Sequence, residues 1–256
     1  MTPDSMWVDD SVVIVTGGAG QLGSTLCERF DELGNTVVMA DIDVDECDSQ
    51  IESRSLDNTH ALEMDVRDPE SVRTGIESVY EEFGSIDALI NNAGIAVFTP
   101  FEERTFEEFD DVMKVNVYGT FFCTQVAREY MSASGGGSIV NIGSIYGVVS
   151  PDPRIYGDSG LNSSEVYGAS KAAIIQMTQY MAVHLANDQI QVNCVSPGGI
   201  FADQDDEFLE NYREKTPAGR MAREEDLVDL IVFLTADSAS YITGQNIVVD
   251  GGFTAW

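Results

Sequence analysis

The sequence predicts an α/β fold: a doubly wound sheet of seven mainly parallel strands with helices on both faces. Three observations predict it. Seven short apolar runs alternate with longer amphipathic stretches along the whole chain. Near-continuous apolar strands are typical of a parallel sheet that helices cover on both faces. No repeat, low-complexity segment or composition shift marks a linker, so we expect an N-terminal tail over residues 1–10 and a single domain over residues 11–256.

The elements follow in a regular order. The predicted strands cover residues 12–15, 36–40, 60–64, 88–91, 138–142, 191–196 and 246–249. The predicted helices cover residues 21–33, 69–83, 106–131, 166–186 and 224–234. Two of these helices have explicit start signals. Asp68 precedes a proline at the first helical position, and Thr105 with Glu108 forms a capping-box pattern.

The charge is strongly one-sided. The chain has 44 acidic and 13 basic residues, which gives a net charge of −31. Nucleic acid and anionic membrane surfaces are poor partners for such a chain, because both require a basic footprint. The acidic residues are spread along the chain, which resembles proteins adapted to a salt-rich, halophilic cytoplasm; an acidic mesophilic protein is the alternative.

The cysteines and the N-terminus indicate a cytoplasmic protein. Cys27, Cys47, Cys123 and Cys194 lie far apart with no CxxC pair, so we expect reduced, mostly buried thiols and no metal site. No basic residue precedes Arg29 and no apolar signal-peptide core is visible. The longest uncharged stretch is rich in Gly, Ser and Asn, so we expect no membrane span.

A glycine-rich turn connects the first predicted strand to the first predicted helix. Gly18, Gly20 and Gly23 fit GxGxxG, and Gly17, Gly20 and Gly23 fit GxxGxxG. Glycine is needed where the backbone turns tightly and approaches a pyrophosphate, which then lies at the helix N-terminus. A turn without ligand is the alternative, but the strand before it and the helix after it favour a Rossmann-type dinucleotide site.

Asp41 ends the second predicted strand, 24 residues beyond Gly17. Its carboxylate can accept hydrogen bonds from both hydroxyls of an adenosine ribose, and it would repel a 2′-phosphate. Ile42 follows it, and no basic residue stands near it in the sequence. The pattern therefore favours NAD over NADP.

The catalytic signal lies further along the chain. Tyr167 and Lys171 stand four residues apart on one predicted helix face. Ser144 follows the fifth strand, and Asn116 lies in a predicted helix. Three further motifs stand in order: Asp65 after the third strand, Asn91-Asn92-Ala93-Gly94 after the fourth, and Ser196-Pro197-Gly198 after the sixth. Together they resemble the short-chain dehydrogenase/reductases over residues 10–256, although each motif alone could be structural.

The resemblance implies an NAD-dependent oxidoreductase (EC 1.1.1.-) with Asn116, Ser144, Tyr167 and Lys171 as the catalytic set. Tyr167 is then the general base, because Lys171 and a positive nicotinamide favour its phenolate over the ordinary pKa of about 10. Ser144 binds the substrate oxygen, Lys171 also holds the nicotinamide ribose, and Asn116 keeps a water in the proton relay. Tyr156 does not fit this pattern, since a glycine stands four residues after it.

The resemblance also assigns the cofactor contacts. The expected NAD-binding residues are Gly17, Gly20, Gln21, Leu22, Gly23, Asp41, Ile42, Asp65, Val66, Asn92, Ala93, Gly94, Tyr167, Lys171, Pro197, Gly199 and Ile200. The C-terminal segment 244–252 resembles the family's last strand, which commonly lies at a tetramer interface. We therefore expect a homotetramer.

Three features depart from the compact family pattern. Gln21 stands where the loop usually has its middle glycine, and Ala202 replaces a threonine after the Pro-Gly turn. Ser144 and Tyr167 are 23 residues apart, more than is usual, and the added segment 151–160 is expected to overhang the substrate pocket. These features are most similar to oxidoreductases of flagellin modification and legionaminic-acid-type sugar synthesis.

That similarity implies a substrate. We expect a secondary alcohol or ketone on a sugar phosphate or nucleotide sugar for surface-glycan synthesis. Ser144 and Arg154 are the expected substrate-binding residues, because Arg154 lies in the added segment and arginine binds phosphate bidentately. Two alternatives stay open: a 3-oxoacyl-type or other small-ketone reductase, and a non-catalytic NAD-binding sensor or scaffold.

Overall fold

The computed structural model describes residues 10–157, 159 and 161–256. The expected tail over residues 1–10 lies outside this part, apart from Asp10. The strands are β1 (Val12–Thr16), β2 (Thr36–Asp41), β3 (Thr59–Glu63), β4 (Ala88–Asn91), β5 (Gly137–Ile142), β6 (Ile190–Pro197) and β7 (Asn246–Val249). They form one seven-stranded sheet in the order β3-β2-β1-β4-β5-β6-β7. Every neighbouring pair is parallel, so the predicted fold class is confirmed.

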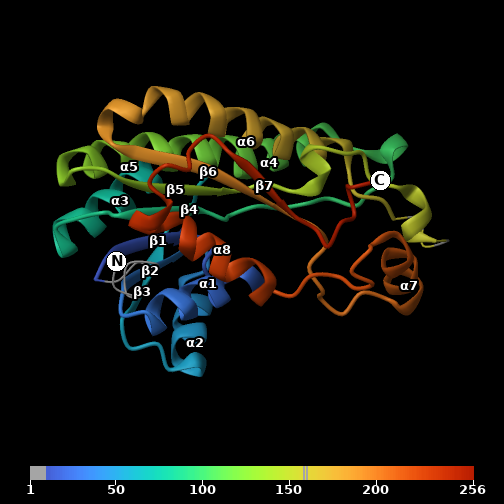
Figure 1. Cartoon of the computed structure of the whole chain (residues 1–256), viewed down its shortest axis with the longest axis horizontal. Helices are drawn as coiled ribbons and strands as arrows, with labels where there is room; N and C mark the ends of the chain where they lie inside the picture. The colour runs from blue at the N-terminus through green and yellow to red at the C-terminus, as the bar shows by residue number, and fades with distance from the viewer. Residues whose placement is uncertain (1–9, 158, 160) are drawn as a thin grey trace.

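Helices cover the sheet in two layers, as Figure 1 shows. The helices are α1 (Gln21–Glu32), α2 (Val44–Arg54), α3 (Pro69–Phe83), α4 (Phe106–Met113), α5 (Thr120–Ser134), α6 (Glu165–His184), α7 (Asp206–Lys215) and α8 (Glu225–Thr235). The layer of α3 to α6 lies on one face of the sheet, and α1, α2 and α8 lie on the other (Figure 1). Helix α7 stands apart, at the end of the molecule where the C-terminus lies.

Each layer has its own apolar core. On the first face Val72 and Ile76 of α3 and Met131 of α5 pack against the sheet. On the second face Phe30 of α1 and Ile231 of α8 do the same. Because both faces of the strands are covered, β1 is buried along its whole length, as its unbroken apolar sequence requires.

The predicted helix starts are confirmed. Asp68 caps α3 by accepting a hydrogen bond from the Glu70 N–H, and Thr105 and Glu108 form a reciprocal capping box at α4. The predicted continuous helix over 106–131 is wrong in one respect. Residues 114–119 form a π-helical segment (η3, Lys114–Gly119) between α4 and α5, and such a segment shifts the residues that face the sheet.

The carboxyl ends of β1 to β6 point to one edge of the sheet. The strand order reverses between β1 and β4, where helices leave to opposite faces. Ligands of open α/β sheets bind in the crevice that this reversal creates. None of the helices in the described part is both long and apolar enough to cross a membrane.

Candidate active site

The glycine-rich turn leaves no room for side chains. Gly17 has a φ of +61°, a conformation that favours glycine. A Cβ on Gly23 would lie 2.1 Å from the carbonyl oxygen of Gly17, so the helix start packs directly on the loop. Helix α1 begins after Gly20 without a side-chain cap and without an acidic residue in its first turn. Its N-terminal N–H groups are therefore suited to an anion such as a pyrophosphate.

Beside this loop lies a cavity of about 430 Å³ that runs over the ends of β1 to β4. Its lining includes most of the expected NAD-binding residues: Gly17, Gly20, Gln21, Leu22, Asp41, Ile42, Asp65, Val66, Asn92, Ala93 and Gly94. The Asp41 carboxylate accepts hydrogen bonds from the N–H groups of Ala19 and Asp43 at 3.2 and 3.3 Å, which fixes it at the end of β2.

Arg67 also lines this cavity, and sequence reasoning did not single it out. Its guanidinium donates to both carboxylate oxygens of Asp65, at distances of 2.7 to 3.1 Å. These hydrogen bonds are the main cause that lowers the pKa of Asp65. Arg67 is therefore occupied by a carboxylate, which reduces its ability to attract a 2′-phosphate.

A second cavity of about 640 Å³ continues from the first, and the two share Gln21, Leu22, Asn92, Gly94 and Ile95. Ser144, Tyr167 and Lys171 all line it, although they come from the end of β5 and from α6. Pro197, Gly199 and Ile200, which follow β6, lie on its wall. The chain therefore brings the expected base, its cation and the expected nicotinamide segment to one place.

Tyr167 is half-buried, and the site brings Ser144 and Lys171 to the same cavity. Burial raises the pKa of its phenol, and the hydrogen bond with Ser144 acts in the opposite direction. The Ser144 hydroxyl accepts a hydrogen bond from the Tyr146 N–H at 3.1 Å, so its own proton remains available for an oxygen in the cavity. A phenolate at position 167 requires a nearby positive charge to offset the burial.

Lys171 supplies that charge. Its Nζ lies 5.6 Å from the centroid of the Tyr167 ring and donates a hydrogen bond to the Ile142 carbonyl at 2.8 Å. The residue is only 4% exposed, and this burial lowers its pKa to about 8. At neutral pH most of the ammonium is still charged, and it can favour the Tyr167 phenolate.

Asn116 lies next to the cavity but is fully buried and does not line it. Its amide donates to the Ile95 carbonyl at 3.0 Å and to the Ser170 hydroxyl at 2.9 Å, and its oxygen accepts from the Ile95 N–H at 2.8 Å. The π-helical segment η3 places it there. The side chain thus joins the cavity-lining segment that contains Ile95 to the helix that carries Lys171.

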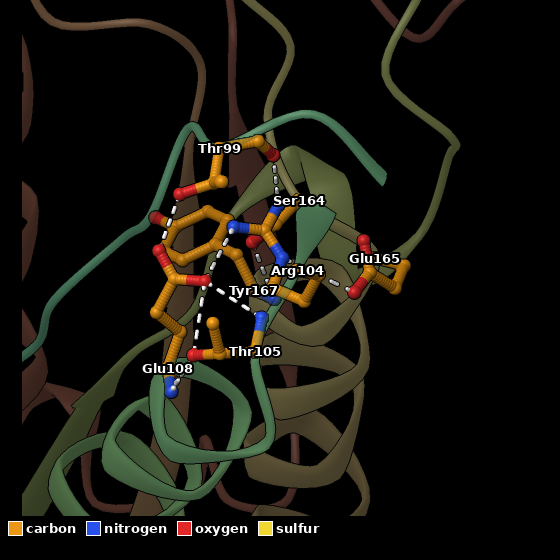
Figure 2. A network of polar contacts seen from close by, with 7 residues as sticks. All are labelled: Thr99, Arg104, Thr105, Glu108, Ser164, Glu165 and Tyr167. Carbon is orange, nitrogen blue, oxygen red and sulfur yellow. Dashed lines mark hydrogen bonds and ion pairs between the residues drawn. The ribbon is translucent and has the colours of Figure 1, made fainter. Parts of the chain in front are cut away.

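A buried arginine, Arg104, lies among polar groups close to the start of α6, as Figure 2 shows. The guanidinium of Arg104 donates to the Thr99 carbonyl at 2.6 Å and forms an ion pair with Glu165 at 3.3 Å. Its Nη1 lies 4.0 Å from the Glu108 carboxylate. Glu165 begins the helix that carries Tyr167 (Figure 2), so Arg104 connects that helix to the segment after the cavity-lining Phe98.

The end of the larger cavity away from the glycine-rich turn is aromatic and polar. Of the described residues of the added segment, Tyr156 and Ser159 line the cavity, so the segment reaches the pocket with part of its length. The other lining residues at this end are Phe98, Tyr146, Leu161, Ser163, Gln204, Asp205, Phe208, Tyr212 and Met221. Lys171 is the single basic residue of the described lining.

Two expected residues lie away from the cavities. Arg154 is not part of the lining of either cavity; its side chain is 86% exposed and binds both carboxylate oxygens of Asp152 at 2.7 to 2.9 Å. Gly23 lies behind the loop, where its role is the close packing described above.

The unusual loop residue Gln21 has a structural partner. Its Nε2 donates to the Phe201 carbonyl at 2.6 Å and also contacts Glu224. It thereby connects the glycine-rich loop to the segment after β6, a contact that a glycine at this position could not make. After the Pro-Gly turn, the Ala202 N–H donates to the Gln204 side chain at 2.8 Å.

Known proteins resemble the chain along its whole length. Residues 18–254 match the sequence profile of the family described as enoyl-(acyl carrier protein) reductase. An NAD-dependent glycerol dehydrogenase of Listeria innocua is 35% identical, over 96% of this chain and 95% of its own. The 3-oxoacyl-[acyl-carrier-protein] reductase FabG of Thermotoga maritima is also 35% identical, over 96% and 99%. A crystal structure of a short-chain dehydrogenase from Leptospira borgpetersenii with bound NAD+ is 41% identical, with a TM-score of 0.88 over 99% of this chain and 96% of that one.

Proposed function

This chain belongs to the short-chain dehydrogenase/reductase family of oxidoreductases, and on that premise we propose that it is an NAD-dependent dehydrogenase of secondary alcohols. The observation that carries the proposal is the position of Ser144, Tyr167 and Lys171 in one cavity that continues into the glycine-loop cavity. A non-catalytic NAD sensor would not require this arrangement.

The cofactor fit favours NAD. The loop backbone, with Gly17 and Gly23 too tightly packed for side chains, forms a cradle for a pyrophosphate at the start of α1. Asp41 presents a carboxylate at the end of β2, where an adenosine ribose would lie. Arg67 is held by Asp65, so the negative Asp41 would dominate the contact with a 2′-phosphate.

The chemistry of this chain's residues follows from their contacts. NAD supplies the hydride acceptor when it is bound. Ser144 donates a hydrogen bond to the substrate oxygen, and Tyr167 takes the hydroxyl proton as a general base. Lys171 favours the Tyr167 phenolate, and Asn116 fixes the segment around Ile95 against the helix that carries both residues.

The cavity favours a neutral substrate. A sugar phosphate or nucleotide sugar, as the sequence similarity implied, requires a basic group at the substrate end. The described lining offers only Lys171, which lies beside Tyr167, and it includes the carboxylate of Asp205. Since Arg154 is engaged by Asp152 outside the cavity, we propose a neutral sugar-derived or similar small alcohol without a phosphate.

A 3-oxoacyl reductase is the second candidate, because the reductase of Thermotoga maritima is 35% identical over almost its whole length. Acyl carrier proteins are acidic partners, and a chain with a net charge of −31 would repel them. Asp41 also disfavours NADP. We therefore place this activity second.

The same reasoning extends to the working molecule. We propose that residues 11–256 act as one NAD-binding and catalytic domain, because both cavities lie at one edge of one sheet. The four cysteines are unbonded buried thiols, which supports a cytoplasmic location.

The test is a spectrophotometric assay with purified protein. NAD or NADP is supplied with neutral polyols, simple secondary alcohols, glycerol phosphate and nucleotide sugars, and the reverse reaction is run with an acetoacetyl thioester. We expect NAD-linked oxidation of a neutral alcohol. Turnover only with a phosphorylated sugar, or only of the thioester with NADPH, would contradict this substrate class.

The Tyr167→Phe variant tests the catalytic assignment. Removing the phenolic oxygen removes the base but leaves the ring and the cofactor loop in place, so we expect kcat to fall at least ~100-fold while NAD affinity changes little. Tyr241→Phe is the matched control, because Tyr241 is fully exposed and far from the lining of the cavity. Substantial residual turnover in Tyr167→Phe would exclude Tyr167 as the base.

A further inference from the structure

The segment 151–157 contributes one wall residue, Tyr156, to the larger cavity and is attached to α7. The Asp152 carboxylate accepts a hydrogen bond from Lys215 of α7 at 2.5 Å. Ile155 is 2% exposed in a small core with Tyr212 of α7 and Phe253 near the C-terminus. The segment is therefore a packed part of the fold with a fixed inner surface.

Tyr156 is the aromatic side chain that this segment contributes to the cavity. Its ring packs edge-on against Phe208 of α7, with a centroid distance of 5.3 Å. The next residue lets the segment lie close to α7. Gly157 has a φ of +54°, and a Cβ there would meet the Glu207 carboxylate at 2.2 Å. The ring of Tyr156 is thus held on one side, while the residue stays on the cavity lining.

Tyr156 shares the lining of the cavity with other residues that carry hydroxyl groups. Tyr146, two residues after Ser144, lines the same cavity, and its N–H donates a hydrogen bond to the Ser144 hydroxyl at 3.1 Å. Burial is the main cause that raises the pKa of Tyr146, and Tyr156 adds to it. Burial likewise raises the pKa of Tyr167, which lines the same cavity as Tyr156 and Tyr146.

These hydroxyls differ in how they are used. The Tyr212 oxygen already accepts a hydrogen bond from the Gly199 N–H at 2.6 Å, and Ser144 and Tyr167 belong to the reacting oxygen. Tyr146 and Tyr156 are the two remaining tyrosines of the described lining. A pair of neutral hydroxyls can both donate and accept, and it matches a second alcohol group on a substrate rather than an anion.

We propose that Tyr156 and Tyr146 form a specificity subsite that binds a second hydroxyl of the substrate, next to the carbinol that reacts at Tyr167. The subsite selects neutral polyhydroxy alcohols over mono-alcohols of the same skeleton. The inference rests on the proposed dehydrogenase function and specifies its substrate class. Aromatic rings of Phe98 and Phe208 line the same cavity and suit the C–H faces of such a substrate.

The experiment compares glycerol with isopropanol as probes. Both have a secondary carbinol on three carbons, and only glycerol has neighbouring hydroxyls. NAD-linked kcat/KM is measured for the wild type, Tyr156→Phe, Tyr146→Phe and the double variant. Because phenylalanine keeps the ring and its packing on Phe208, we expect Tyr156→Phe to lower kcat/KM about tenfold more for glycerol than for isopropanol.

The double variant sharpens the test. If both hydroxyls bind the same substrate group, the double variant loses less than the product of the two single losses. A Tyr156→Phe variant that affects both alcohols equally assigns Tyr156 a packing role and overturns the inference. Tyr241→Phe, with a fully exposed ring, is the control and should leave the glycerol-to-isopropanol ratio unchanged.

Failure of the proposed function has a different signature. A wild-type protein that oxidises neither alcohol, nor any other alcohol of the panel, contradicts the dehydrogenase assignment, and the subsite is overturned with it. A wild type that oxidises both alcohols with no preference for glycerol overturns the subsite alone.

Discussion

Lys171 combines its proposed catalytic role with an energetic cost to the fold. Its ammonium is 4% exposed and makes one hydrogen bond, to the Ile142 carbonyl at 2.8 Å. Burial lowers its pKa from 10.5 to about 8, so the folded protein binds the Lys171 proton more weakly than the unfolded chain does. Below pH 8 Lys171 is protonated in both the folded and the unfolded state, so the buried ammonium lowers the free energy of unfolding by its full amount. Above pH 8 the folded state releases the proton, and this destabilisation becomes smaller.

We predict that Lys171→Met stabilises the cofactor-free protein at pH 7 while it abolishes turnover. Methionine fills a similar volume without a charge, and the lowering of the Lys171 pKa corresponds to a gain on the order of 3 kcal/mol. The gain should become smaller between pH 8 and 10, because the wild type is then relieved of its charge. Urea unfolding of both proteins at pH 7 and pH 10 measures this difference.

Lys114→Met is the matched control. Lys114 is exposed and paired with Asp110, so its replacement should change the unfolding free energy by less than ~1 kcal/mol. If Lys171→Met were less stable than the wild type at pH 7, the hydrogen bond to Ile142 would outweigh the desolvation of the charge. The buried lysine would then be a stabilising residue.

At the scale of elements, the sequence predicted what apolar patterns determine. All seven strands were placed, because a buried parallel strand needs an unbroken apolar run such as residues 12–15. Helices α2 and α7 were not placed. Each buries a single residue, Cys47 and Tyr212 respectively, so neither has an apolar stripe that the sequence could reveal.

The sequence also predicted those site residues that lie in recognisable motifs, but not those whose positions depend on tertiary packing. The ordered motifs led to Ser144, Tyr167 and Lys171, which the fold brings to one cavity. The π-helical segment around Asn116 was not predictable, because one extra residue in a helical turn leaves no periodic signal in six residues. The positions of Tyr156 and Arg154 depend on how segment 151–157 packs on α7, which is a tertiary contact with no local pattern.

Arg104 was missed for a similar reason, since arginine is rarely buried and nothing in its neighbours indicates that it is. Its side chain is 7% exposed between α4 and α6 (Figure 2). In the described part of the chain its Nη1 has no hydrogen-bond partner and reaches only an ion pair with Glu108. The positive charge of Arg104 is therefore stabilised by Thr99, Glu108 and Glu165 together.

We predict that Arg104→Met destabilises the fold by roughly 2 kcal/mol and lowers Tm by about 4–8 °C. The substitution removes the connection between the two helix starts and leaves the Glu108 and Glu165 carboxylates without their cation. Thermal unfolding measures the effect. Arg73→Met is the control, because the exposed Arg73–Glu129 pair at 3.5 Å should contribute less than ~1 kcal/mol. Equal Tm values for the two variants would show that Arg104 is not a structural clamp.

On the scale of the whole molecule, the negative surface charge opposes association of subunits, whereas exposed apolar surface favours it. Most of the 13 basic residues already have an acidic partner, for example Arg54 with Glu28 and Arg128 with Asp188. The remaining acidic residues repel each other across the surface. At the same time β7 is the edge strand of the sheet, and Val248 on this strand is exposed. This exposed edge suits the subunit interface of the expected homotetramer, which would bring together copies of a highly negative chain.

We predict that salt stabilises both the fold and the expected homotetramer. The Debye length falls from about 10 Å at 0.1 M to about 3 Å at 1 M salt, so KCl weakens repulsion between acidic residues within and between subunits. Tm should rise steadily with KCl, and light scattering should show dissociation, with loss of activity, below roughly 0.5 M KCl. Sucrose is the control, because it favours compact states without screening charge. If sucrose matched KCl, or if Tm were flat with salt, the surface charge would not limit stability and the protein would be an acidic one without halophilic adaptation.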